Sequence, residues 1–381
     1  MEPTLPAVEA GTTPAPAAPT EFFLTFSGSG GEYFRIWIVN LLLTIATLGI
    51  YGAWAKVRRL RYFYGHTTLA GSSFEYHAQP RQILVGRLIA LALILPYYLL
   101  QFWRPLWSLA FLALLLVALP FIVVRSQRFH LRMSSWRNVR FNYVGTYGAA
   151  AAAYLGWGLL TLVSIGLLGP YADLKRQRLR IAYSRFGGVP FEYGARPGRF
   201  YVAYLVALGV GLVALLGFGI LIGVMMMTIF GLAGGGKSGN MSVYLQQIFN
   251  GHGSIGSRLA ALAAVVAFYV AYFVVLFLPY AIVRARTSNE SLNSTTLRAH
   301  RLHSRLDSTS LWGLMVSNLL LVVITLGMFA PWAHVRLVRY QLEHTSLIAS
   351  GSLDDFINEP QVQTGAAAQE LSDFMDLDFG L

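Results

Sequence analysis

The sequence predicts an all-α polytopic membrane protein with three repeated helix–Gly-break–helix units and small cytoplasmic β elements. Hydrophobic residues make up 55% of the chain and charged residues only 12%, against about a quarter charged in typical soluble domains. Long uncharged stretches are present at 106–124, 200–236 and 259–283, and a helix needs ~20 such residues to cross a bilayer. Nearly all of the 29 basic residues lie in segments that can be placed on one side of a membrane.

A 30-residue segment occurs twice. Residues 40–69 and 318–347 match at 16 of 30 positions without a gap. The matched pairs include Asn40 and Asn318, Gly49 and Gly327, and Trp54 and Trp332. A weaker copy at 161–178 aligns with 44–61, and a short echo relates 120–125 to 279–284. The predicted order is therefore unit, apolar hairpin, unit, apolar hairpin, unit.

The predicted boundaries follow this order. They are a disordered tail (1–21), repeat unit 1 (22–82), transmembrane hairpin 1 (83–124), repeat unit 2 (125–199), transmembrane hairpin 2 with a Gly-rich outer loop (200–283), repeat unit 3 (284–353) and an acidic tail (354–381). The first tail is biased to Pro, Ala and Thr, which is typical of disorder. The last 41 residues carry eight acids and no base.

The distribution of basic residues predicts the membrane topology. If all seven apolar segments crossed, the bases would divide about evenly between the two sides. If each repeat unit instead dips in and returns, 25 bases lie inside, three lie outside (Arg104, Lys237 and Arg258), and Arg87 falls within a span. Basic residues accumulate on the cytoplasmic side of short loops. We therefore expect four crossing helices, re-entrant repeat units and cytoplasmic termini.

Each repeat contains the break that a re-entrant unit requires. Gly49, Gly166 and Gly327 follow about half a membrane of apolar helix, where Gly can end a helix and turn the chain. The arm after the first break, 54–64, mixes apolar, cationic and aromatic residues, which is typical of a helix in the headgroup layer. Alternating stretches predict short strands at 22–28, 73–78, 129–133, 139–145 and 189–194.

Two sets of polar residues are candidates for function. The six basic residues that recur in the repeats are candidates for lipid or anion contact: Arg58, Arg61, Lys175, Arg178, Arg336 and Arg339. The simpler interpretation is that they snorkel to phosphates as topology anchors. Asn40 and Asn318 lie in apolar helices, where a carboxamide either faces a ligand or forms an interhelical hydrogen bond. We favour the hydrogen bond.

Other chemistries find little support. The pattern G-x4-G-K-S at 231–238 resembles a phosphate-binding loop, but an apolar run precedes it where the motif needs a strand. We interpret it as a flexible loop and expect no nucleotide. The chain has no cysteine and its eight histidines lack a metal-binding spacing. No catalytic constellation is present, so we expect no cofactor, no metal and no enzyme activity. A basic surface facing lipid explains the charge without nucleic acid.

The segment Phe26–Arg35, the TLGIY-x-x-WA core at 47–55, Phe74-Glu-Tyr76 and the Asp/Phe-rich end at 376–381 resemble the YjgN-like family of bacterial inner-membrane proteins. The resemblance covers roughly 22–381. It implies a multi-pass protein of the cytoplasmic membrane, grouped as a domain of unknown function. It brings no established activity or binding residues.

Two functions remain open. We expect a membrane binding or scaffold module whose basic inner face engages anionic lipid, with membrane lipids as its partners. The alternative is a permease or channel for a small, anionic solute. Repeats and broken helices favour transport, whereas the scarcity of ionisable residues within the spans and the interfacial arginines favour the binding module. The sequence does not fix the oligomeric state.

Overall fold

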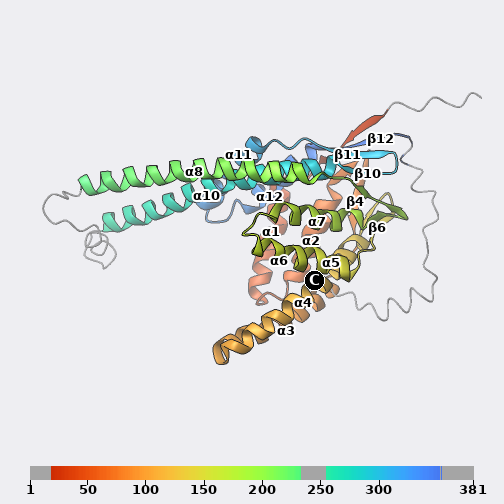
Figure 1. Cartoon of the computed structure of the whole chain (residues 1–381), viewed down its shortest axis with the longest axis horizontal. Coiled ribbons are helices and arrows are strands. Elements are labelled where there is room, and N and C mark those ends of the chain that lie inside the picture. The colour runs from red at the N-terminus through yellow and green to blue at the C-terminus, as the bar shows by residue number, and fades with distance from the viewer. Residues whose placement is uncertain (1–18, 233–254, 352, 354–381) are drawn as a thin grey trace, which may run out of the picture.

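The structure is a computed structural model and describes residues 19–232, 255–351 and 353. Nearly all of the predicted N-terminal tail, most of the Gly-rich loop with its 231–238 pattern, and the acidic C-terminal tail lie outside these residues. The described chain is mainly helical, with short strands gathered at one end (Figure 1).

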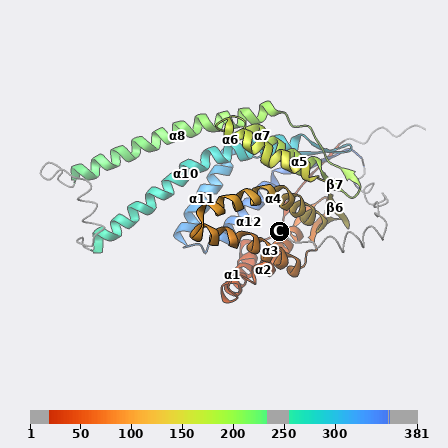
Figure 2. The same cartoon turned by 60° about the horizontal axis from the view of Figure 1, so that its bottom comes forward.

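Four helices are long and apolar enough to cross a membrane. They are α3 (Pro80–Trp103), α4 (Pro105–Arg132), α8 (Pro197–Leu232) and α10 (Ile255–Asn293). α3 packs against α4 and α8 packs against α10, which gives two long hairpins. Both hairpins project away from the strands (Figures 1 and 2). The two predicted apolar hairpins are therefore present, and their helices account for all four span candidates in the described chain.

Three shorter helical hairpins separate and flank the long ones. The first pairs α1 (Gly30–Ala46) with α2 (Gly52–Gly65), and the last pairs α11 (Ser308–Ile324) with α12 (Ala330–Glu343). In the middle hairpin the first helix is continuous but has three parts: α5 (Tyr147–Ala151), the π-helix η1 (Ala152–Gly156) and α6 (Trp157–Val163). The chain then turns back into α7 (Gly169–Ala182). The order along the chain is therefore short, long, short, long, short.

The same backbone turn ends the first helix of each short hairpin. Gly49, Gly166 and Gly327 have φ of +95°, +87° and +92°. The Gly49 N–H donates to the Thr44 carbonyl at 2.7 Å, and its two counterparts make the same bond. These turns expose apolar tips, with Leu48 95% exposed. α1 has 17 residues and so measures about 25 Å at 1.5 Å per residue, less than the ~30 Å of a hydrocarbon core.

Every helical hairpin leads into a β-hairpin at the other end of the molecule. The strands are β3 (Thr67–Leu69) with β4 (Ser72–Tyr76), β5 (Ser134–Trp136) with β6 (Val139–Tyr143), β7 (Ser184–Phe186) with β8 (Val189–Pro190) and β9 (Glu192–Tyr193), β10 (Thr295–Leu297) with β11 (His300–Ser304), and β12 (Thr345–Ala349) with β1 (Thr20–Phe23) and β2 (Thr25–Phe26). The last hairpin joins the two ends of the described chain.

One strand prediction is wrong. Residues 129–133, expected as a strand, form the last turn of α4 and its C-cap at Met133. Phe129 is fully buried against the α2–α3 unit, so packing of an amphipathic helix overrides the short alternating pattern. The strand of this hairpin begins at Ser134 instead.

The strands close into a ring. They form a five-stranded sheet in the order β1-β12-β11-β10-β9 and a seven-stranded sheet in the order β2 to β8. β1 and β2 are separated only by Leu24, and β8 and β9 only by Phe191, so two bent strands join the sheets on both sides. One hydrophobic cluster takes side chains from all five β-hairpins, including Leu69, Trp136, Phe186, Leu297 and Leu347. The ring therefore wraps a single filled core.

The spacing of elements around this ring is constant. In each of the five places the first strand begins two residues after its incoming helix ends, and the outgoing helix begins four residues after the last strand residue. The first strand residue is always Ser or Thr, and its hydroxyl donates to the helix carbonyl four residues earlier. These bonds are Thr67 to Phe63, Ser134 to His130, Ser184 to Arg180, Thr295 to Ser291 and Thr345 to Gln341, at 2.6–2.8 Å. The described chain thus contains five helix–hairpin–helix units.

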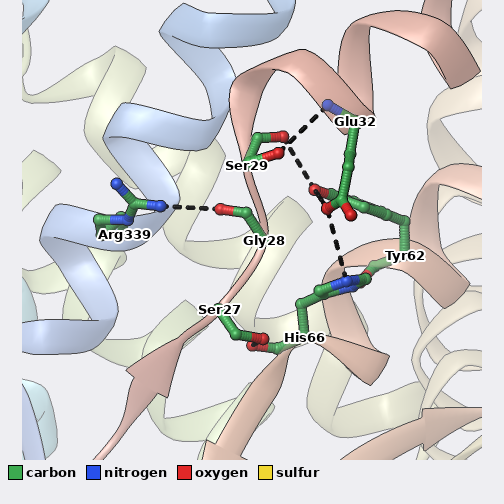
Figure 3. Close-up of polar contacts among 7 residues, drawn as sticks. All are labelled: Ser27, Gly28, Ser29, Glu32, Tyr62, His66 and Arg339. Carbon is green, nitrogen blue, oxygen red and sulfur yellow. Dashed lines mark hydrogen bonds and ion pairs between the residues drawn. The ribbon is translucent and has the colours of Figure 1, made fainter.

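Hydrogen bonds close the seam of the ring, where residues 27–29 lie between α12 and α2 (Figure 3). Arg339 of α12 donates to the Gly28 carbonyl at 2.8 Å. The Tyr62 hydroxyl of α2 donates to the Ser29 carbonyl at 2.9 Å. The Ser27 N–H bonds the His66 carbonyl at 3.0 Å. The segment between β2 and α1 is thereby held by both neighbouring helices.

The turn at Gly49 gives a direct stability test. A Cβ at Gly49 or at Gly148 of α5 would meet no atom within 4 Å, but only Gly49 has a positive φ. Gly49→Ala should therefore lower the free energy of unfolding by about 1 kcal/mol, because an L-residue in this region is strained. Gly148→Ala, the matched control, should be neutral or stabilising. Chemical denaturation in detergent measures both, and equal effects would contradict the turn geometry.

Candidate functional site

A cavity of about 450 Å³ lies at the seam of the ring. α1, α2 and α12 form its walls, and Arg87 reaches it from α3. Three cationic side chains line it, Lys56, Arg59 and Arg87. The remaining lining residues are Tyr33, Trp37, Asn40, Leu41, Thr44, Gly52, Ala55, Ala330 and His334. No carboxylate is among these described lining residues, so the cavity concentrates positive charge without a counter-ion from the protein.

The local sequence explains how the three cations converge. Lys56 and Arg59 are three residues apart on α2 and therefore share one helix face. Arg87 enters two turns after α3 begins. A Cβ added at Gly52 would overlap the Arg87 guanidinium. The absence of a side chain at position 52 is what leaves room for Arg87 beside α2.

The pKa values of two cavity side chains, Lys56 and His334, are lowered by burial and, as expected where positive charges lie together without a negative one, by nearby arginines. Burial lowers the pKa of Lys56, and the nearby Arg87 and Arg59 lower it further. Burial, with a further contribution from Arg59, also lowers the pKa of His334, so this imidazole is neutral at pH 7. An anion in the cavity would oppose the like-charge repulsion and raise the pKa of Lys56 again.

The two repeated asparagines take different roles. Asn318 has both ends of its carboxamide bonded: Nδ2 donates to the Ala333 carbonyl at 3.1 Å, and Oδ1 accepts from Arg336 at 2.8 Å. Asn40 is only 7% exposed and lines the cavity. Its Oδ1 is buried with no hydrogen-bond partner in the described chain. The interhelical hydrogen bond expected for both residues is therefore found at Asn318 and not at Asn40.

One substitution between the copies accounts for this difference. Arg58 is the counterpart of Arg336, but its Nη1 donates to the Tyr51 hydroxyl at 3.2 Å. The counterpart of Tyr51 is Phe329, which has no hydroxyl. Arg336 therefore bonds Asn318, whereas Arg58 bonds Tyr51 and leaves Asn40 Oδ1 without a donor among the described residues. The Arg336–Asn318 hydrogen bond therefore has no counterpart between Arg58 and Asn40.

The six predicted basic residues are not gathered at one site. Arg61 donates to the Ala78 carbonyl at 3.0 Å and Arg339 to the Gly28 carbonyl at 2.8 Å, so both tie an incoming helix to the loop after its β-hairpin. Lys175 and Arg178 line a second cavity of about 280 Å³ beside η1, where Lys175 lies 5.0 Å from the Tyr171 ring centre. Lipid contact by the six residues stays a prediction.

The recurring bases belong to a wider pattern. In each of the five units, the residue nine positions before the first strand is basic: Arg58, Arg125, Lys175, Arg286 and Arg336. The residue just before it is buried and apolar in every unit: Val57, Val124, Leu174, Ala285 and Val335. A ring of bases therefore lies at one level of the molecule, about 13 Å from the strands at 1.5 Å per residue.

Sequence reasoning missed the cavity itself. Lys56 and His334 occupy equivalent positions but differ in type, and Arg59 recurs only as Arg176 of the weaker copy, so the repeat does not single them out. Arg87 carried a usable signal, because it falls within a span, and an ionisable residue there is a candidate for function by default. Trp54 and Trp332 are structural: Trp54 packs on the cluster of Ala53 and Val57, and Trp332 stacks on Phe329 at 5.8 Å.

Comparison with known proteins identifies relatives along most of the chain. The family model described as "Bacterial protein of unknown function (DUF898)" matches residues 21–374. "Inner membrane protein YjgN" of Salmonella typhimurium is 26% identical over 364 residues, which cover 87% of this chain and 89% of the relative. The protein of the same name from Escherichia coli strain K12 is 34% identical over 122 residues, 31% of this chain and 30% of the relative. No solved structure matches the chain.

Proposed function

The chain belongs to the DUF898 family of bacterial proteins, and from this premise we propose that it is an inner-membrane binding module whose seam cavity holds the headgroup of an anionic lipid. The single observation that carries the proposal is the convergence of Lys56, Arg59 and Arg87 on one cavity without a carboxylate. Like charges held close together repel one another unless a counter-ion is present. A phosphate supplies that charge, and arginine binds phosphate with paired N–H donors.

The depth of the cavity supports a lipid as the source of the phosphate. Arg104 forms the turn between α3 and α4. Arg87 lies about 25 Å from it along α3 at 1.5 Å per residue. With Arg104 at the outer boundary of a ~30 Å hydrocarbon core, Arg87 sits just inside the opposite boundary. Trp37 and Leu41 give the cavity an apolar edge, which suits the start of an acyl chain.

The three short hairpins support the same assignment. We propose that they are copies of one helix–Gly-break–helix unit that enters the membrane and returns. Their exposed apolar tips, Leu48, Ile165 and Leu326, suit insertion into hydrocarbon. The level ring of bases then lies near the cytoplasmic headgroups, where each base contributes to attraction for anionic lipid. We expect no catalytic activity of this site.

A permease for a small anion is the rival function. Repeated units and broken helices are common in transporters, and an anion held by three cations could be a cargo rather than a lipid headgroup. The rival predicts that the cavity exchanges its ligand with the aqueous phase. The lipid assignment predicts that the ligand is extracted only with detergent or organic solvent.

The topology has its own test. The protein has no cysteine, so single cysteines are clean reporters. Ser73→Cys and Gly188→Cys, both exposed at the strand end, should resist a membrane-impermeant thiol reagent in intact cells. Arg104→Cys should react. Labelling of Gly188→Cys from outside would restore a topology in which the repeat helices cross.

The cavity is tested by removing its charge. Lys56→Ala combined with Arg87→Ala should lower retention of anionic phospholipid severalfold in native mass spectrometry of the detergent-purified protein. Arg81→Ala is the matched control, because Arg81 is an exposed base on the same helix as Arg87 that does not line the cavity. Equal retention by the double variant and the control would refute the lipid site. Uptake of a radiolabelled anion into proteoliposomes, lost in the double variant, would support the permease.

A further inference from the structure

We propose that the seam cavity selects an anionic glycerophospholipid whose headgroup carries a free hydroxyl, and that Asn40 Oδ1 accepts a hydrogen bond from this hydroxyl. The inference rests on the proposed lipid site and names its ligand class. The three cations account for a phosphate, but they do not account for the carboxamide that lies beside them. Asn40 is the feature of the cavity that a bare phosphate leaves unexplained.

The Asn40 carboxamide needs a partner that donates. Its Oδ1 is an acceptor, is buried, and has no hydrogen-bond partner in the described chain. Leaving such an atom unpaired costs free energy. An ionised phosphate offers only acceptors, so it can pair with Nδ2 but not with Oδ1. A hydroxyl near the phosphate can donate to Oδ1, so that both polar atoms of the carboxamide are hydrogen-bonded.

The other copy of the unit shows what this position requires. At Asn318, Arg336 donates to Oδ1 at 2.8 Å and the Ala333 carbonyl accepts from Nδ2 at 3.1 Å. The first unit has the same asparagine, yet Arg58 is directed to Tyr51. The first copy therefore has the same carboxamide, but its arginine, Arg58, does not donate to it. In this unit the donor has to come from the ligand.

Charge and hydrogen bonding argue against two other headgroups. An ethanolamine headgroup also donates, but it would add a fourth cation beside Lys56, Arg59 and Arg87. Fully ionised phosphatidic acid has no donor, and neighbouring cations favour its ionised form. A phosphoglycerol headgroup has one negative charge and two hydroxyls. The 450 Å³ cavity has room for it, since one water takes up about 30 Å³.

The test compares an anionic lipid that has free headgroup hydroxyls with one that has none. The detergent-purified full-length protein is exchanged into mixed micelles with equimolar phosphatidylglycerol and phosphatidylethanol, which share the anionic phosphodiester but differ in free hydroxyls. Native mass spectrometry then counts bound lipid. We expect phosphatidylglycerol to be retained about tenfold over phosphatidylethanol, the gain typical of one hydrogen bond to a buried group. Equal retention of the two lipids would overturn the inference while leaving the anionic-lipid site intact.

Variants and a soluble probe complete the design. Asn40→Leu should reduce the phosphatidylglycerol preference to near one while total anionic lipid stays bound, and Arg81→Ala, which removes an exposed base outside the cavity, should keep the preference. A preference that survives Asn40→Leu would contradict the role of Asn40. Soluble glycerol phosphate in excess should not displace the lipid; displacement would assign the cavity to a soluble phosphate ester instead. Loss of both lipids from the wild-type protein would refute the lipid site itself.

Discussion

The pairing of β1 with β12 is the contact on which the rest of the structure depends. It joins residues 20–23 to residues 346–349 and so turns a row of five helix–hairpin–helix units into a closed ring. Without it, α1 and α12 would be the ends of an open array, with unpaired strand edges on either side. With it, every β-hairpin has two neighbours, and the five pairs of helices are held with their tips on one side.

The ring also fixes where charge lies. Because each strand starts two residues after its incoming helix and is locked by the same hydroxyl–carbonyl bond, equivalent residues of the five helices fall at one level. A base at the shared position therefore becomes part of a ring of bases. At the seam the two copies differ: Tyr51 stands at the position of Phe329, and Asn40 lacks the partner that Asn318 has. Lys56 and Arg87 line the same cavity there. The departure from the repeat produces the cavity.

Local features of the fold were predictable, and distant pairings were not. The four spans, the order of long and short hairpins and the turns at Gly49, Gly166 and Gly327 depend on composition and on single residues, so the sequence indicates them. The second strands of the first three β-hairpins alternate visibly, but the first strands are only three residues long and give no pattern. The echo between 120–125 and 279–284 aligns residues 159 apart, whereas the equivalent first-strand residues, Ser134 and Thr295, are 161 apart. The sequence echo is therefore shifted by two residues from the structural equivalence. Ring closure joins opposite ends of the chain, which no local pattern encodes.

The candidate site was likewise only partly predictable from the sequence. The recurring arginines were found because they repeat, and two of them bond backbone carbonyls within their own unit. Among the cations of the cavity only Arg59 has an identical counterpart, Arg176 of the weaker copy, so a search for residues shared by all the repeats passes over them. Two sequence signals pointed to the site: Arg87 within a span, and the Asn40 carboxamide in an apolar helix.

The most direct measurement is electron cryomicroscopy of the protein in nanodiscs that contain phosphatidylglycerol. The account predicts a headgroup density in the seam cavity, with its phosphate within hydrogen-bond distance of Lys56, Arg59 and Arg87 and its glycerol against Asn40. A cavity filled by solvent, with ordered lipid phosphates only on the outer faces of the helices, would contradict it.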